Sequence, residues 1–204
     1  LFDGFTLLDA FGPAEALGNA PPYQLGFYSA EGGEIRSAQG LEVRTHPMGE
    51  RPAGAVLLLP GRPGTRSLVD NPSFLARLRT WAEECQALLS VCTGAALLAR
   101  GGLLAGRAAT SNKEAWAWVT SQDSRVDWQY RARWVADDGK REGCALPDKE
   151  IYSSAGVSAG IDMALGFLAD RHGRALARRI ARHMEYVWRE DPGADPFAED
   201  DLGF

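Results

Sequence analysis

The feature that most constrains this fold is an apolar run that ends at a cysteine and is followed at once by a helix-forming segment. Residues 87–91 (Ala-Leu-Leu-Ser-Val) predict a buried strand, and the residues from Gly94 onward predict a helix. Cys92 then stands on a tight strand-to-helix turn at the carboxyl edge of a sheet. The free N–H groups and positive end of the helix are expected to lower its thiol pKa. The sequence therefore predicts a nucleophilic cysteine; the alternative is a small buried hydrophobic residue.

Residues 55–59 (Ala-Val-Leu-Leu-Leu) form a second continuous apolar run, closed by the loop Pro60-Gly61-Arg62. Such runs are typical of parallel sheets covered on both faces, so both runs are expected in the interior of one sheet. Loops at the carboxyl ends of these strands bind ligands in open α/β folds, and Gly61 would let the backbone and its N–H approach a substrate. The alternative for this loop is a plain turn.

The rest of the chain alternates between strand and helix patterns, which indicates one α/β domain over residues 1–204 with a mostly parallel sheet. Asn71 is expected to cap a helix that ends near residue 84. Residues 31–34 predict a turn, and a hairpin is expected about Gln39-Gly40. Further strands are expected at residues 1–2, 23–29, 130–135 and 151–154, further helices up to residue 169 and at 174–188, an exposed loop at 137–150 and an irregular acidic tail at 191–204.

Composition narrows the partners and the compartment. Three cysteines without a C-x-x-C pair argue against a disulfide framework and predict a reducing, cytoplasmic location. No apolar run is long enough for a membrane span, and no signal-peptide pattern is present. A formal net charge of −5 disfavours nucleic acid, and the arginines of residues 171–189 are interpreted as a solvated helix face. A small molecule is therefore the expected partner.

Five segments together resemble the DJ-1/PfpI superfamily. They are Leu-Leu-Asp-Ala-Phe-Gly-Pro-Ala-Glu-Ala-Leu at residues 7–17, Leu-Pro-Gly at 59–61, Ser-Val-Cys-Thr-Gly at 90–94, Gly-Gly-Leu-Leu-Ala-Gly-Arg-Ala-Ala-Thr at 101–110 and Ala-Gly-Val-Ser-Ala-Gly-Ile-Asp-Met-Ala-Leu at 155–165. Within that superfamily the chain is most similar to the isonitrile hydratases. The resemblance covers nearly the whole chain, in order.

The resemblance implies a flavodoxin-like, class I glutamine amidotransferase-like three-layer sandwich and a homodimer. It assigns Cys92 as the nucleophile, Asp9 as the acid/base carboxylate beside it, and Thr93 as a helper through its hydroxyl or backbone N–H. Gly61 would contribute to an anion site opposite. Glu15 is the second carboxylate to consider, although it also suits the first turns of a helix electrostatically.

Three positions depart from the family patterns. Thr93 stands where PfpI-type peptidases have a histidine after the cysteine, which argues against peptidase chemistry. Ser111, Asn112 and Lys113 stand where related hydratases read Thr-His-Trp, so Asn112 is expected on the pocket wall. Arg62 replaces the second glycine of a Pro-Gly-Gly motif and is expected to bring a charge to the mouth of the site.

The reaction that the resemblance implies is addition of water to an isonitrile, giving an N-substituted formamide through a Cys92 thioimidate. Asp9 would supply the proton, and burial beside a thiolate is expected to raise its pKa. This chemistry needs no metal and no organic cofactor. Two alternatives remain open: a glyoxalase-like or oxidative-stress protein in which Cys92 becomes a sulfinate, and a non-catalytic ligand-sensing domain of an AraC-type regulator.

Overall fold

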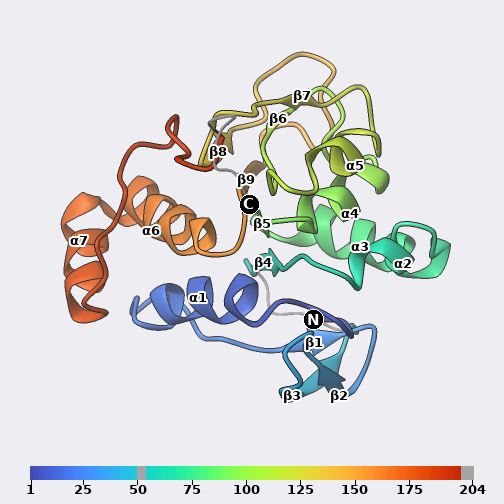
Figure 1. Ribbon diagram of the computed structural model, residues 1–204, viewed down its shortest axis with the longest axis horizontal. Coiled ribbons are helices and arrows are strands. Elements are labelled where there is room, and N and C mark those ends of the chain that lie inside the picture. The colour runs from blue at the N-terminus through green and yellow to red at the C-terminus, as the bar shows by residue number, and fades with distance from the viewer. Residues whose placement is uncertain (50–53, 199–204) are drawn as a thin grey trace.

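The computed structural model describes residues 1–49 and 54–198 as an α/β sandwich of three layers. The central sheet has the strand order β4-β5-β9-β8 (Figure 1). Strands β4, β5 and β9 are parallel, and β8 pairs antiparallel to β9. The flavodoxin-like, mostly parallel sheet expected from the sequence is thus confirmed for the centre of the molecule.

The element bounds are α1 Leu7–Gly18, β1 Tyr28–Ser29, β2 Glu31–Arg36, β3 Glu42–Pro47, β4 Val56–Leu59, α2 Thr65–Leu68, α3 Pro72–Glu84, β5 Ala87–Val91, α4 Gly94–Arg100, β6 Ala108–Ala109, α5 Trp116–Thr120, β7 Asp127–Trp128, β8 Trp134–Asp137, β9 Glu150–Ser154, α6 Ala159–His172 and α7 Arg174–His183. Within the described part of the chain, no helix is both long and apolar enough to cross a lipid bilayer.

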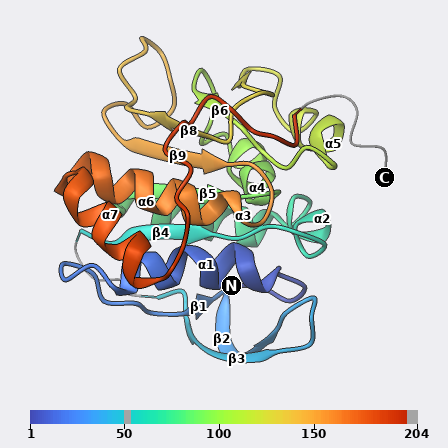
Figure 2. The same cartoon turned by 60° about the vertical axis from the view of Figure 1, so that its left-hand side comes forward.

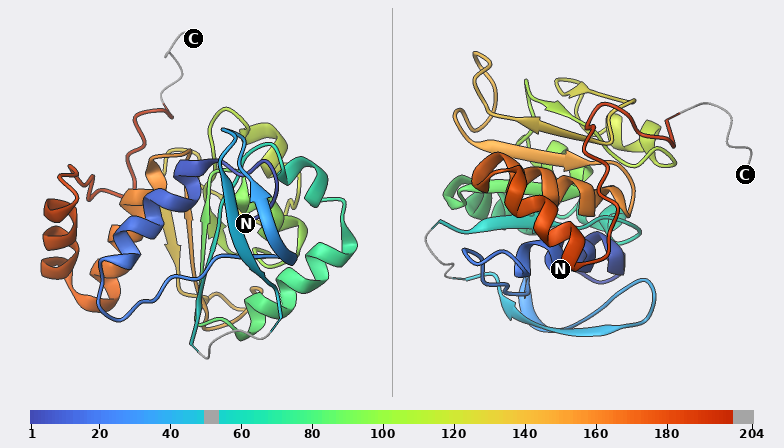
Figure 3. Two further views of the ribbon diagram at one scale, coloured as in Figure 1. Left: turned by 90° about the horizontal axis from the view of Figure 1, so that it is seen from below. Right: turned by 90° about the vertical axis from the view of Figure 1, so that its left-hand side faces the viewer.

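Strand β5 lies in the middle of the sheet and divides the hydrophobic core in two. Leu88 packs into a cluster with α3 and α4 on one face, while Leu89 and Val91 pack with α6 on the other. All five residues of the strand are buried, because successive side chains point to opposite faces and both faces are covered by helices (Figure 3, left). The first apolar run is therefore the interior strand that the sequence predicted.

Strand β4 lies at the edge of the four-stranded sheet, so its predicted interior position is wrong. Three of its four residues are only half-buried. Leu57 nevertheless packs against one core cluster, and Val56 and Leu58 pack against the other. A continuous apolar run indicates that both faces of a strand are covered by other residues. It does not indicate whether the strand is paired with other strands along both of its edges.

A separate three-stranded sheet, β1-β3-β2, lies beyond α1, at the foot of the molecule in Figure 2. The predicted hairpin is confirmed, with Arg36 opposite Glu42 across the turn. Residues 31–34 belong to β2, so their prediction as a turn is wrong. The two glycines there have positive φ angles, which a strand tolerates at a local kink.

Most of the remaining elements match the predicted types with shifted bounds. The Asn71 side chain accepts a hydrogen bond from Phe74 N at 3.0 Å and caps α3, as predicted. Strand β8 begins later than expected, at Trp134, and the predicted strand at residues 23–29 is reduced to β1. Leu1 and Phe2 form no strand. Residues 191–198 contain no helix or strand, and the rest of the predicted tail lies outside the described residues.

Candidate active site

Cys92 occupies a strained turn between β5 and α4. Its φ angle is +59°, a left-handed conformation that is uncommon for a residue with a side chain. Its N–H donates to Ser154 O and Ala155 O, each at 3.2 Å, and Ser111 Oγ donates to its carbonyl oxygen at 2.7 Å. These bonds hold the peptide groups on both sides of the Cys92 Cα, so the strained conformation is fixed by its surroundings. The residue has no exposed surface.

Two glycines make room for this turn. A Cβ atom at Gly61 would lie 2.4 Å from Thr93 N, and one at Gly94 would lie 2.5 Å from Leu59 O. Both distances are far below van der Waals contact with backbone atoms that cannot move aside. The loop after β4 therefore packs directly on the start of α4, which brings residues 60–62 to the cysteine.

Asp9 reaches the same place from the first turn of α1 and is fully buried. Its Oδ2 accepts a hydrogen bond from Gly61 N at 3.0 Å, and its Oδ1 has no partner of hydrogen-bonding geometry among residues 1–49 and 54–198. Burial raises the pKa of Asp9 to about 6, and the Gly61 N–H, the Cys92 thiol and the Arg62 charge offset only part of that effect. The expectation of a raised pKa for this carboxyl group is confirmed.

The prediction of a lowered pKa for Cys92 is wrong. Burial, followed by the negative charge of Asp9, raises the pKa of Cys92 to about 12. The Arg62 charge and the N–H groups of Thr93 and Val157 favour the thiolate but do not outweigh burial. The field at a helix start is worth at most about 2 kcal/mol, which is less than the cost of removing a thiolate from water. The resting site therefore pairs a neutral thiol with a nearby carboxylate.

The hydroxyl of Thr93 holds the loop. It accepts a hydrogen bond from Arg62 N at 2.5 Å and another from Thr65 Oγ1 at 3.1 Å. Its backbone N–H is the group directed to the Cys92 sulfur. Of the two roles expected for Thr93, the backbone role is the one that this geometry fits.

Arg62 lies beside this cluster, and its side chain is partly exposed. Its φ angle is +88°, and its Nη2 forms an ion pair with Glu114 Oε2 at 3.1 Å. Burial lowers the pKa of Arg62, but the negative charges that Cys92, Glu114 and Asp9 carry when ionised raise it by more. The guanidinium therefore stays charged within electrostatic reach of both reactive groups. The predicted charge beside the site is present in the structure.

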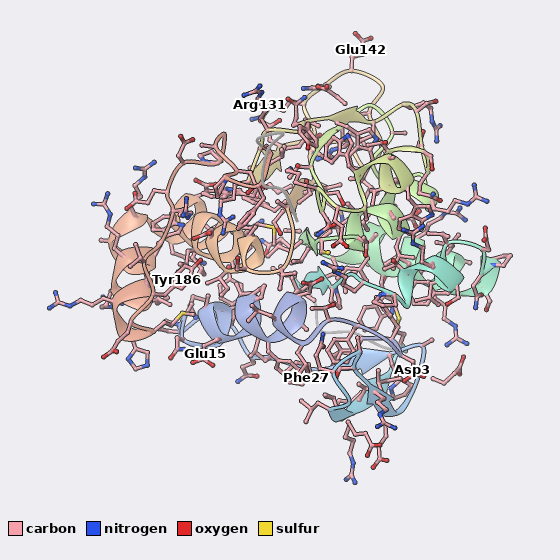
Figure 4. All side chains as sticks on the ribbon, viewed as in Figure 1. Asp3, Glu15, Phe27, Arg131, Glu142 and Tyr186 are labelled. Carbon is pink, nitrogen blue, oxygen red and sulfur yellow. The ribbon has the colours of Figure 1, made fainter. Side chains whose placement is uncertain are left out.

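Asn112 and Glu15 have local structural contacts. Asn112 Oδ1 accepts a hydrogen bond from Ala115 N at 2.9 Å, and a Cβ atom on Gly156 would lie 2.4 Å from Asn112 Nδ2. Glu15 is exposed and bonds to Asn19 Nδ2 at 3.0 Å, on the outer side of α1 (Figure 4). The structure brings Asp9 to the cysteine and leaves Glu15 outside the cluster.

Sequence reasoning missed two participants, Val157 and Glu114, and named Ser111 only as a departure from the family pattern. Val157, with φ at +48°, follows β9, the parallel neighbour of β5, so its turn opens at the same sheet edge as Cys92. The small-residue stretch after β9 was the available signal. Glu114 carried no signal, because its pairing with Arg62 depends on how two loops approach each other. Within the described ranges, no group of three or more His, Cys, Asp or Glu side chains is arranged to hold a metal ion.

A buried cysteine on a strained strand-to-helix turn, with a carboxyl group beside it, defines the class of this α/β protein. The model of the DJ-1/PfpI family matches residues 1–170, and the chain belongs to that family.

Individual relatives differ in what they do. The chain is 27% identical over 188 residues to isonitrile hydratase of Pseudomonas putida, which covers 92% of this chain and 76% of that protein. It is 27% identical over 194 residues to the HTH-type transcriptional regulator GbdR of Pseudomonas aeruginosa, which covers 91% of this chain but 49% of the regulator. The crystal structure of a THiJ/PfpI family protein from Pseudomonas syringae is similar with a TM-score of 0.74, at 25% identity, over 98% of this chain and 76% of that one.

Proposed function

We propose that this protein is a cysteine-dependent hydratase that converts an isonitrile into an N-substituted formamide. The observation that carries the proposal is the buried pair of Asp9 and Cys92. A carboxyl group with a pKa of about 6 is mostly ionised at pH 7, whereas a thiol with a pKa of about 12 keeps its proton. Asp9 is then the base and Cys92 the proton donor. The similarity to isonitrile hydratase supports the proposed reaction.

The first half of the reaction uses this proton. The Cys92 sulfur forms a bond to the terminal isonitrile carbon while its proton moves to Asp9. Asp9 returns that proton to the same carbon, which gives a thioimidate, R–N=CH–S–Cys92. The carboxyl group begins as a base and ends as one, so this order replaces the expectation that Asp9 starts as the acid.

The second half consumes water. A water molecule adds to the thioimidate carbon as Asp9 accepts one of its protons and passes it to the nitrogen. The carbon–sulfur bond then breaks, the hydroxyl proton returns to the sulfur through Asp9, and R–NH–CHO leaves. The backbone N–H groups of Thr93 and Val157 lie where charge develops on the sulfur, so they stabilise its anionic character during both halves.

The direct experiment is to incubate the purified protein with a panel of small alkyl and aryl isonitriles and to detect formamides by mass spectrometry. We expect turnover that is lost by about 10⁴-fold or more in Cys92→Ser, which keeps the size of the side chain. The matched control is Cys144→Ser, because Cys144 donates to Gly139 O in the loop before β9 and lies in a different element. Formamide produced equally well by Cys92→Ser would refute the proposal.

The other activities fit these observations less well. Oxidation of a cysteine to a sulfinate depends on thiolate character and exposure, and Cys92 has neither. A ligand-sensing role has one specific observation in its favour, the match to GbdR. A protein that binds an isonitrile without consuming it would support that second candidate. The homodimer is proposed from family resemblance alone, and light scattering at micromolar concentration checks it.

A further inference from the structure

One charged side chain beside the Cys92–Asp9 pair has no part in the proton transfers. The Arg62 side chain is about one-third exposed, and its ion-pair partner Glu114 is 77% exposed. Ion pairs that are this accessible to water contribute about 0–1 kcal/mol, so the Arg62–Glu114 pair is easily exchanged. Arg62 also faces the negative charge that arises at Cys92 and Asp9.

The backbone of Arg62 is held much more firmly than its side chain. Its N–H donates to Thr93 Oγ1 at 2.5 Å, and its carbonyl oxygen accepts from Thr65 N at 2.8 Å and Thr65 Oγ1 at 2.9 Å. These bonds fix a φ angle of +88° that a non-glycine residue rarely adopts. The Arg62 side chain therefore starts from a fixed backbone position next to Thr93, the neighbour of the nucleophile.

Access to the thiol requires a movement. Cys92 has no exposed surface, so a substrate has to displace a neighbour to reach the sulfur. The backbone groups around the turn at Cys92 are fixed by hydrogen bonds, whereas the Arg62 side chain is joined to Glu114 by an exchangeable contact. A substrate group that replaces Glu114 as the partner of Arg62 would therefore be held beside Thr93 and Cys92.

We propose, resting on the hydratase function above, that the substrate carries a carboxylate close to its reactive carbon and that Arg62 binds it, exchanging Glu114 for the substrate. A guanidinium presents two parallel N–H donors that match the two oxygens of a carboxylate, a geometry that lysine does not offer. Arg62 is thus a specificity-determining residue, and the substrate class is that of small isocyano carboxylates.

The first test compares isocyanoacetate with its methyl ester, two isonitriles of similar size that differ in charge. We expect wild-type kcat/KM to be about 10- to 100-fold higher for the carboxylate, the range of a charge-assisted hydrogen-bonded pair. Arg62→Met is expected to remove this preference, mainly through KM, so that the ratio of kcat/KM for the two isonitriles falls to about one. Equal kcat/KM for the two isonitriles in the wild type would overturn the proposal.

Two further variants test whether the preference depends on Arg62 in particular and is not lost through a general effect on folding. Glu114→Gln removes the competing carboxylate and is expected to raise the preference for isocyanoacetate by about two- to fivefold. Arg66→Met removes a neighbouring arginine that stacks on Trp118 at 3.9 Å, and it is expected to leave the preference unchanged. A preference lost equally in Arg62→Met and Arg66→Met would contradict a specific role for Arg62.

A second readout does not depend on hydratase activity. Iodoacetate and iodoacetamide alkylate thiols, and they differ in the carboxylate that the first carries. The iodoacetate-to-iodoacetamide rate ratio at Cys92, followed by peptide mapping and divided by the ratio for N-acetylcysteine, is expected to exceed one by about tenfold and to fall to one in Arg62→Met. This result with no isonitrile turnover would keep the anion site and refute the hydratase; a ratio of one in the wild type would refute the anion site.

Discussion

Two buried clusters in this molecule each contain an aspartate, and they differ in how completely their polar groups are hydrogen-bonded. In the first, Arg107 is fully buried and its Nε donates to Asp137 Oδ1 at 2.8 Å. The other four N–H groups of Arg107 donate to the backbone oxygens of Ala145, Leu146, Asp137 and Lys149. The Asp137 carboxylate also accepts from Ala108 N and Gly139 N. Every donor of the arginine has a partner.

The second cluster, Asp9 with Cys92, is left incomplete. Within the part of the chain that the structure describes, the Asp9 carboxyl group has one backbone donor and one oxygen without a hydrogen-bond partner, although the residue is as deeply buried as Arg107. The pKa of Asp9 rises to about 6 and that of Cys92 to about 12. The comparison teaches that burial with complete hydrogen bonding holds a charge in place, whereas burial with unused hydrogen-bonding capacity accompanies the raised pKa values of Asp9 and Cys92.

The largest expected contrast is in activity. Asp9→Asn keeps the shape and an acceptor for Gly61 N but cannot carry the proton, so kcat should fall by about 10²–10⁴-fold. Because Asp9 and Cys92 serve the same step, the double variant with Cys92→Ser should be hardly less active than Cys92→Ser alone. Both expectations are checked by measuring isonitrile turnover by Asp9→Asn, Cys92→Ser and the double variant. A fully active, folded Asp9→Asn protein would end the assignment of Asp9 as the proton carrier.

The satisfied cluster should respond in stability instead. Arg107→Met leaves Asp137 buried without its cation, and the free energy of unfolding should fall by about 3–5 kcal/mol. Urea unfolding monitored by tryptophan fluorescence measures this loss. Adding Asp137→Asn should restore part of it, because the uncompensated charge is removed. Turnover per folded molecule should stay near the wild-type value; a large loss of turnover in the folded fraction would contradict the contrast.

The smallest effect concerns pH. The pKa of Asp9 is raised on folding, so the folded state binds this proton more tightly, and the cost of burying the ionised group is present above pH 6 and disappears as the pH falls below about 4. Asp9→Asn should therefore be more stable than the wild type by about 3 kcal/mol at pH 7, an upper bound. The difference should vanish near pH 4. Urea unfolding of both proteins at pH 7 and pH 4 checks this, and a difference independent of pH would mean that Asp9 is not buried as a charge.

The strand-to-helix turn at Cys92 was predictable because its sequence signal is local. A buried apolar run, a cysteine and a helix-forming segment follow one another within residues 87–100, and the sequence alone gives the strand, the turn and the start of α4. The position of Asp9 beside Cys92 came from the family resemblance and agrees with the structure. The hairpin of β2 and β3 and the cap at Asn71 are likewise set by neighbouring residues.

Features that depend on distant contacts were not predictable. The edge position of β4 is set by pairing, which hydropathy does not encode. The thiol pKa was predicted in the wrong direction, because the dipole of a helix start can be inferred from sequence whereas the depth of burial cannot. The Arg62–Glu114 pair joins two loops, and the role of Val157 needed the alignment of β9 beside β5.

The tightly packed turn at Cys92 also affects how the chain folds. Its closing hydrogen bonds join residues 52 positions apart, from Gly61 to Asp9, and 31 positions apart, from Arg62 to Thr93. Contacts of such long range require closure of large loops before they stabilise anything, and they slow folding. The raised pKa values of Asp9 and Cys92 exist only after α1 and the loop following β4 have docked on β5. A chain still emerging or still collapsing therefore carries an ordinary cysteine, and the Asp9–Cys92 pair forms only once these long-range contacts have closed.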